Sequence, residues 1–439
     1  MTQTESKPLV VDFIPGFDED RFSGMDTSSE PAVLQAKREE GFNDYRALPS
    51  PTNRTEEWRR TDPALFPFAE MERLPQVKSV PEMPEGEWDR HFDVVVSVDH
   101  GSMAIADRSG VLADGRIHVM SLADAAERHP ELVRDHLQGR ALPSKTGKFE
   151  ALNDAFWNAG LCVHIPEGVE LPKGVLIRCS IEADRSVFIP RLLVVAGKRS
   201  RATIAEHLVS PDAISMMAVM EKELYVGEAA NLQMITLQEW GLNSCQIAND
   251  WALVERDARI NWFMLNFGSR LGKMRFGSDV AGPGAAADLD GIFCLNGEQH
   301  MDQKTLQIHS SADTYSRLLY KGAVRDRAYS VYQGLIIARR DAVRVDAYQT
   351  NNNLVLNKGA RADSIPGLEI DADDLKCSHG STHGNIDPEQ LYYLRARGIS
   401  EAEARKILIL GFYDEVVERI PLDFIREHVR RKIDRKLEG

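Results

Sequence analysis

The sequence predicts a mainly β protein, a stacked β-helix with helical regions before and after it. Three observations support this fold class: β-rich runs follow one another from about residue 151, a small cassette recurs among them, and helical patterns occupy both ends. The runs include VLIRCSI, RLLVVAG, ATIAEHLV and NLQMITLQEW, and turns rich in glycine, asparagine or charged residues separate them.

The recurring cassette predicts how the strands are arranged. It consists of an apolar strand end, a short polar or glycine turn, a small residue and a new alternating run. The small residues stand at intervals that are multiples of 14: Ala230, Ala258, Ala286, Ala328 and Ala342. Such a step fits one strand, a tight turn and a return strand, which is stabilised by stacking on its neighbours. A β-sandwich, whose strands are also closely spaced, is the alternative.

The N-terminal part is predicted to be mixed and mostly helical. Residues 1–30 have the composition of a flexible lead-in, and residues 31–150 form the N-terminal region. Apolar spacing predicts helices over 32–48 and over 121–137, the second begun by Ser121. VVVSVDHG and SMAIAD, which lie between these helices, are expected to form a strand pair.

Helices return after the predicted β-helix core of residues 151–375. In the C-terminal helical region, 376–439, Asp387 is a helix N-cap and Ser400 opens a Ser-x-x-Glu capping box. The last helix carries one apolar stripe: Leu422, Ile425, Val429, Ile433 and Leu437.

Composition excludes several classes of function. Lys and Arg number 53 against 67 Asp and Glu, and a net charge of −14 disfavours non-specific binding to nucleic acid or membranes. Five scattered cysteines without a C-x-x-C favour a reducing compartment.

With no signal-peptide pattern or long apolar run, a cytoplasmic protein is expected. GSRLGKM lacks P-loop spacing, so the chain is not expected to hydrolyse ATP itself.

The stretch LKCSHGSTHG, residues 375–384, carries the strongest candidate site. Thiolate and imidazole ligands suit zinc, copper(I) and iron–sulfur species, and on an extended backbone Cys377 and His379 lie on the same side. Even with His383 the set does not reach four ligands, so a distant residue or a partner chain must complete it. A polar hairpin in which Cys377 packs as a small apolar group, or a Cys–His nucleophile pair, are the alternatives. Asp373 and Asp374 are interpreted as solvated loop charges.

Residues 346–412 resemble the C-terminal part of the SufB/SufD family, which acts in the SUF pathway of iron–sulfur cluster assembly. This segment contains the stretch LEIDADDLKCSHGSTHGNIDPEQLYYLRARGISEAEARKILILGF. Upstream, EEWRRTDPALF, ALNDAFWNAGLCVHIPEGVEL and RLLVVAGKRSRATIAEHL also resemble family segments, although Arg60 replaces a tyrosine. The resemblance covers roughly residues 36–439.

Three features make the chain more similar to SufD than to SufB. KCSHGSTHG resembles the SufD form Lys-Cys-Ser-His-Gly-Ala-Thr-Val-Gly, with His383 where valine is common. Leu394 stands where some SufB proteins carry a cysteine implicated in cluster assembly. The Cys-rich N-terminal motif of many SufB proteins is also missing. His383 is therefore interpreted as a bystander.

The resemblance implies a right-handed parallel β-helix and the role of a scaffold subunit rather than an enzyme. It implies pairing with SufB through the β-helix and docking of the ATPase SufC through the C-terminal helices, where Leu394, Phe412 and Tyr413 are candidate contacts. A transient iron–sulfur cluster would form at the SufB–SufD interface, with His379 and Cys377 as ligands, and no permanent cofactor is expected. A homodimer is an alternative assembly for the isolated chain.

Two other functions stay open. One is a purely structural adaptor for the ATPase, without metal contact. The other is a β-helix enzyme acting on carbohydrate, which would need catalytic acids along a groove of the core, and residues 200–345 offer no convincing cluster.

Overall fold

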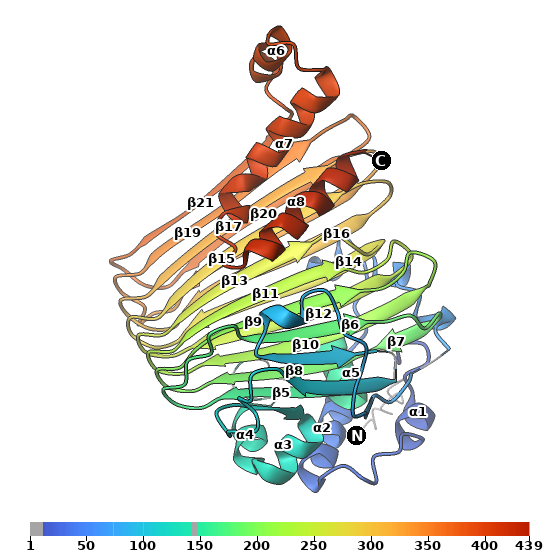
Figure 1. Cartoon of the computed structure of the whole chain (residues 1–439). Coiled ribbons are helices and arrows are strands. Elements are labelled where there is room, and N and C mark those ends of the chain that lie inside the picture. The colour runs from blue at the N-terminus through green and yellow to red at the C-terminus, as the bar shows by residue number, and fades with distance from the viewer. Residues whose placement is uncertain are drawn as a thin grey trace, which may run out of the picture.

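The fold is a parallel β-solenoid of about eight coils with helices at both ends of the chain, as predicted (Figure 1). The computed structural model describes residues 12–72, 74–99, 101–137, 139, 141 and 147–438. The β-sandwich alternative is wrong, because the strands of the core pair in parallel with strands one coil away. Residues 1–11 of the expected lead-in lie outside the described residues, and the remainder includes a short helix and the buried Phe17.

The helices lie at the two ends of the chain. The α-helices are α1 (Glu19–Ser23), α2 (Ala32–Ala47), α3 (Leu122–Arg128), α4 (Pro130–His136), α5 (Lys148–Phe156), α6 (Pro388–Ala396), α7 (Glu401–Val417) and α8 (Asp423–Glu438). Short 3-10 helices are η1 (Glu56–Trp58), η2 (Pro63–Leu65), η3 (Phe68–Glu70) and η4 (Asp89–His91).

Each coil gives one strand to each of two sheets. The eleven-stranded sheet has the order β1 (Lys78–Ser79), β3 (Ser102–Asp107), β2 (Val94–Val98), β6 (Val175–Ser180), β9 (Arg201–Val209), β11 (Asn231–Glu239), β13 (Arg259–Asn266), β15 (Ala286–Leu295), β17 (Tyr315–Val324), β19 (Asp346–Val355) and β21 (Lys376–Gly384). The ten-stranded sheet has the order β20 (Arg361–Ile370), β18 (Tyr329–Ala338), β16 (His300–His309), β14 (Leu271–Val280), β12 (Cys245–Val254), β10 (Met216–Val226), β8 (Pro190–Ala196), β5 (Ala159–Ile165) and β4 (His118–Ser121), and β7 (Ser186–Phe188) pairs with β10.

The 14-residue repeat corresponds to half a coil. Asn231 pairs with Arg259, 28 positions further on, so a full coil consists of two strands and two turns there. Each 14-residue step therefore holds one strand and one turn, and the return strand expected within the same step is supplied by the step that follows. Ala258 is buried directly before β13, as expected where coils crowd, and Asp257 beside it has φ 57°, a left-handed conformation that aspartate tolerates.

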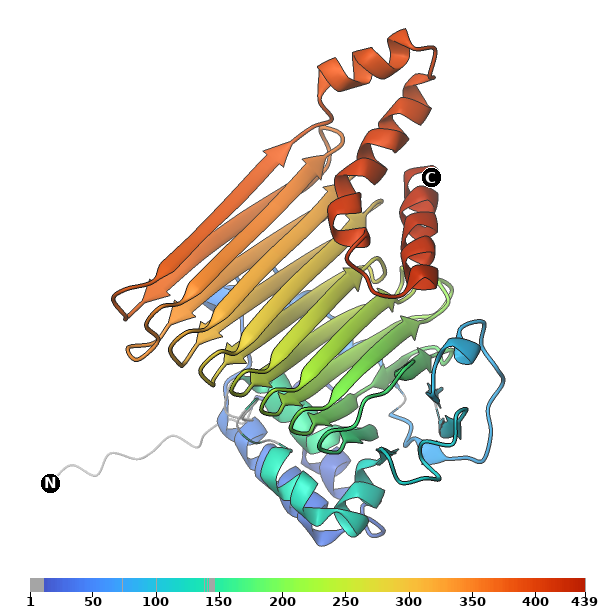
Figure 2. The ribbon, with the colours of Figure 1, turned by 60° about the vertical axis from the view of Figure 1, so that its left-hand side comes forward.

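The three largest hydrophobic clusters among the described residues hold the layers together. Alternate strand residues such as Met220 and Leu224 of β10 fill the interior of the solenoid. The outer face of the ten-stranded sheet packs against the N-terminal helices, and the outer face of the eleven-stranded sheet packs against α7 and α8. Figure 2 shows α7 and α8 along the solenoid wall and the N-terminal helices at the opposite end.

Several individual elements predicted in the N-terminal region are present, but one predicted helix is not. The helix predicted over 32–48 is α2, and β2 and β3 form the predicted pair, which is antiparallel. Ser121 caps α3 as expected, but the single helix predicted over 121–137 is wrong. Proline disfavours helical geometry in the residue before it, so His129 leaves the helical region and α4 starts afresh at Pro130.

The C-terminal helices follow their sequence signals. Asp387 and Ser400 cap α6 and α7, and most of the apolar stripe of α8 is buried. The strand β21, however, continues the solenoid beyond the expected boundary at residue 375, and the first helix after it begins at Pro388. Apart from Leu375, the stretch LKCSHGSTHG therefore forms a strand rather than a polar hairpin.

A buried ion cluster joins the N-terminal region to the first coils. The Arg191 guanidinium of β8 contacts Asp154 of α5 and also Glu221 and Glu223 of β10, and all four side chains are at most 1% exposed. The cation faces three carboxylates, and burial raises the pKa of Glu221 well above its usual range.

We predict that Arg191→Met destabilises the fold by about 3–5 kcal/mol, because it leaves buried carboxylates without their cation. Urea unfolding measures this change. The matched control is Arg199→Met, which removes an exposed pair with Glu167 and should change stability by less than about 1 kcal/mol. Equal effects of the two substitutions would contradict the prediction.

Candidate functional site

The solenoid ends in an open coil. β20 and β21 are the last strands of the two sheets, and among the residues that the structure describes no strand pairs with their outer edges. All residues of both strands are exposed or half-buried. Apolar side chains exposed on β20 are Ile365, Leu368 and Ile370. A free strand edge presents unpaired N–H and C=O groups, which makes this end a template for another chain.

Cys377 and His379 share one face of β21, as predicted. The register places them on Ala347 and Gln349 of β19, which are buried inside the solenoid. Because side chains in register on parallel strands lie on the same face, Cys377 and His379 face the mouth of the interior. Their spacing along the strand, about 6.6 Å, allows both to reach one metal ion or cluster.

His383 lies on the same face but does not complete a site. Its Nε2 is 3.3 Å from Ser381 Oγ, and in the described part of the chain Cys377, His379 and His383 do not gather into a three-ligand group. Asp373 and Asp374 are exposed before β21, as interpreted from the sequence. The structure therefore leaves two candidate ligands on this face, of which His379 is exposed and Cys377 is half-buried.

The Cys377 thiol is protonated at neutral pH. It packs against a buried cluster that includes Val345 and Ala347. Burial raises the pKa of the thiol, and the charge of the Asp346 carboxylate raises it further. A thiol of this kind is a weak nucleophile and becomes a strong ligand only when a metal ion displaces its proton. Such a thiol is a poor match for the Cys–His nucleophile pair.

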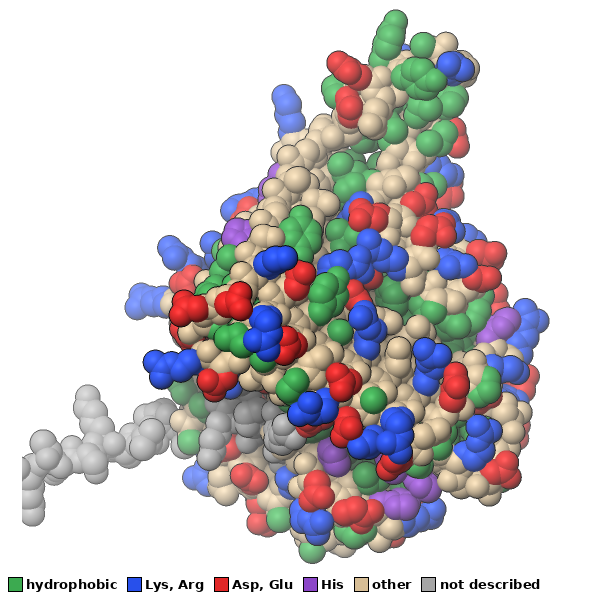
Figure 3. Space-filling view, turned by 90° about the vertical axis from the view of Figure 1, so that its left-hand side faces the viewer, with side chains coloured by type: hydrophobic (Ala, Val, Ile, Leu, Met, Phe, Trp, Pro, Cys, Tyr) green, Lys and Arg blue, Asp and Glu red, His purple; other side chains and the backbone are tan. Residues whose placement is uncertain are grey.

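The three predicted partner contacts differ in burial, and Tyr413 is the one that is completely buried. Its side chain is completely buried between α7 and β15, where the hydroxyl donates a 2.7 Å hydrogen bond to the carbonyl oxygen of Phe293. Leu394 and Phe412 are half-buried. The sequence does not single out Tyr392 and Tyr393 of α6, which are 76% and 57% exposed. Figure 3 shows hydrophobic side chains gathered at the top of the molecule, where α6 lies.

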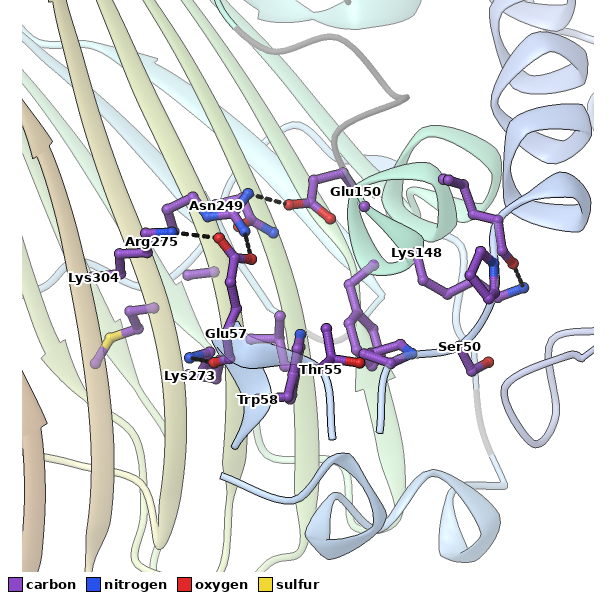
Figure 4. A pocket seen from close by; sticks show the side chains of 18 residues that line it. Ser50, Thr55, Glu57, Trp58, Lys148, Glu150, Asn249, Lys273, Arg275 and Lys304 are labelled. Atoms are coloured by element: carbon purple, nitrogen blue, oxygen red, sulfur yellow. Dashed lines mark hydrogen bonds and ion pairs between the residues drawn. The ribbon is translucent and has the colours of Figure 1, made fainter. Parts of the chain in front are cut away.

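A second polar region anchors the N-terminal segment EEWRRTD to the ten-stranded sheet (Figure 4). It borders a cavity of about 230 Å³. The Glu57 carboxylate contacts Lys304 and lies 2.5 Å from Arg275, which also pairs with Glu150 at 2.8 Å. Lys273 pairs with Asp302 at 2.7 Å. Since these cations already have anionic partners, the region has the chemistry of a structural anchor.

The fold and the site define a class of protein: a β-solenoid whose open end carries a thiol and an imidazole, too few ligands to close a metal site. Among the described helices, none combines the length and the apolar character needed to cross a membrane. Two families match in succession: "SufBD protein N-terminal region" over residues 94–177 and "SUF system FeS cluster assembly, SufBD core domain" over residues 179–412. The chain belongs to the SufBD family of the SUF system for iron–sulfur cluster assembly, as its sequence predicts.

The similar proteins point to the SufD side of this family. SufD of Escherichia coli is 28% identical over 337 residues, which are 75% of this chain and 79% of that protein. SufD of Bacillus subtilis is 26% identical over 333 residues, 74% and 75% of the two chains. An iron–sulfur cluster assembly SufBD family protein of Mycobacterium tuberculosis is 34% identical over 279 residues, 59% and 70% of the two chains. The chain is therefore SufD-like.

We predict that iodoacetamide labels only Cys377 in the folded protein, because the other four cysteines are buried. The raised pKa of Cys377 makes labelling slow at pH 7, with a rate that rises about tenfold per pH unit as the thiolate forms. Peptide mass spectrometry measures each site, and Cys377→Ser serves as the control. Fast labelling at pH 7, or labelling of Cys162 at the same rate, would contradict this account.

Proposed function

We propose that this chain is a non-enzymatic scaffold subunit that supplies half of a transient iron–sulfur site, while a SufB-like partner supplies the other half. The observation that carries the proposal is the position of Cys377 and His379 on the inward face of the last, open strand. Two local ligands at an edge that another chain can extend are what a shared site requires.

The open coil fits a partner that continues the solenoid. A strand added to the edge of β21 would lie about 4.8 Å away and would stack its side chains on the same face. Ligands of the partner would then lie beside Cys377 and His379. Docking on β20 would also cover the exposed Ile365, Leu368 and Ile370.

Weak ligation suits a cluster that must leave again. Structural metal sites are closed by four ligands, whereas this chain offers two. Cys377 is protonated without metal and His379 is exposed, so a cluster bound here stays accessible to an acceptor. The cluster is cargo in this proposal rather than a resident cofactor.

The C-terminal helices are suited to carry a SufC-like ATPase. α6 has no buried residue and presents Tyr392 and Tyr393, while α7 and α8 are fixed to the solenoid. Lys321 of β17 donates a 2.9 Å hydrogen bond to the carbonyl oxygen of Phe412, and Arg325 donates one of 2.7 Å to that of Leu437. A force applied to α6 by an ATPase would therefore reach the coils near the open end.

A purely structural adaptor for the ATPase is the second candidate function. The half-burial of Cys377 among apolar neighbours favours it, because a cysteine can occupy this place as a small hydrophobic residue. The two functions differ in whether His379 contacts the cluster.

We predict that His379→Ala lowers cluster retention at least about tenfold, while assembly with the SufB-like and SufC-like partners persists. Iron and sulfide are measured after co-expression and anaerobic reconstitution of the complex. The control is His383→Val, which should retain the cluster because His383 is assigned no ligand role. Unchanged iron and sulfide in His379→Ala would leave the structural adaptor as the function.

We predict that the double substitution Tyr392→Ser and Tyr393→Ser weakens ATPase binding about 30-fold, the effect of losing roughly 2 kcal/mol at an aromatic contact. Pairing through the open coil should persist. Since neither side chain is buried, the solenoid should stay folded, unlike in a deletion of α7 and α8. Leu242→Ser, an exposed apolar position in the turn before β12, is the control, and equal binding in all three proteins would exclude α6 as the docking element.

A further inference from the structure

Two histidines and a glutamate from three elements converge where α8 crosses the eleven-stranded sheet. His207 lies on β9, Glu239 ends β11 and His428 lies on α8. His207 Nε2 is 2.9 Å and His428 Nε2 is 2.8 Å from the same oxygen, Oε2 of Glu239. One ligand atom from each residue lies within 4.8 Å of the other two, so the three side chains are aimed at one point.

Neighbouring side chains hold these groups in place. The Trp88 ring stacks on His207 with centroids 4.4 Å apart and meets His428 edge-on at 5.0 Å. Lys432 Nζ lies 2.9 Å from the other carboxylate oxygen, Oε1 of Glu239. Such outer contacts fix the orientation of metal ligands, and they leave Glu239 Oε2 with both imidazole Nε2 atoms beside it.

The burial and charge of the cluster suit a cation. The Glu239 side chain is 7% exposed, while His207 and His428 are 17% and 23% exposed, which leaves an entry path. The Glu239 carboxylate lies within hydrogen-bonding distance of His207, His428 and Lys432, so it supplies the negative charge of the cluster.

We propose that His207, Glu239 and His428 bind a divalent first-row transition metal ion, Fe²⁺ or Zn²⁺, which fastens α8 to the solenoid. Two imidazoles and one carboxylate form the ligand set of many catalytic zinc sites and of non-haem Fe²⁺ sites, which keep open coordination positions. The ion would join residues from two neighbouring coils to a helix whose His428 follows Glu239 by 189 positions. This would stabilise the helical hairpin against the wall of the solenoid.

This metal site is separate from the ligand pair on β21. β11 and β21 are five strand positions apart in the sheet, about 24 Å at the usual strand spacing. The proposal therefore does not depend on the scaffold function, and neither His379 nor a partner chain is needed for it.

The test is metal titration of the full-length chain after treatment with a chelator. The background carries Cys377→Ser, His379→Ala and His383→Ala, which removes the exposed ligands of β21. Isothermal titration uses Zn²⁺ in one arm and Fe²⁺ under anaerobic conditions in the other, and visible absorption of bound Co²⁺ reports the ligand set. We expect one ion per chain in at least one arm, and the arm with the tighter binding identifies the preferred ion.

Substitutions assign the ion to its ligands. His428→Gln and Glu239→Gln should each weaken binding at least about 100-fold, whereas the control Lys432→Met should weaken it only about tenfold, as an outer contact does. The bound ion should raise the unfolding temperature of the background protein but not that of His428→Gln. Circular dichroism of each variant without metal checks folding. No saturable binding in either arm, or equal affinity in all variants, would overturn the proposal.

Discussion

In-register hydrogen bonding between successive coils is the constraint on which the rest of the structure depends. Each inner strand of the solenoid pairs its backbone groups with the coil before it and the coil after it, and this register carries every side chain to a defined face. The first coils are closed by the antiparallel strands β3 and β4 and by the N-terminal helices. In the described part of the chain no strand pairs with the outer edges of β20 and β21, so these edges are where the proposed partner would pair.

The same register determines the direction in which the candidate ligands Cys377 and His379 point. A slip of one residue in the pairing of β19 with β21 would turn Cys377 and His379 to the outer wall. In the observed register they stack on residues of the interior, at the place where an added coil would bring its own side chains. The outer face of the eleven-stranded sheet has different neighbours. It packs against the buried apolar residues of α7 and α8, and it contributes to the cluster around Glu239.

Local signals allowed much of the fold to be predicted. Capping by Asp387 and Ser400 depends on a few neighbouring residues, so both helix starts are correct. The 14-residue spacing indicates stacking, but it does not say whether one or two strands complete a coil. β21 was harder to place because an open edge strand has no buried face, and LKCSHGSTHG consequently lacks alternating apolar residues.

In the candidate sites too, features set by neighbouring residues could be predicted, whereas features set by tertiary packing could not. Cys377 and His379 are two positions apart, so their common face follows from an extended backbone alone. Tyr413 and Tyr393 are chemically alike, and only tertiary packing buries one and exposes the other. His207, Glu239 and His428 are far apart in the chain, and their convergence depends on the coil length and on where α8 lies. In the structure the coil offset of 30 residues, which pairs Arg201 with Asn231, brings His207 close to Glu239.

Hyperfine spectroscopy on the assembled complex tests the shared site most directly. This chain alone would carry ¹⁵N-histidine, and the reduced cluster would be observed by pulsed electron paramagnetic resonance. The account predicts a ¹⁵N coupling of the size of a directly bound imidazole, which disappears in His379→Ala and persists in His383→Val. A cluster that forms in full without any ¹⁵N coupling from this chain would contradict the claim that the open coil supplies one of its ligands.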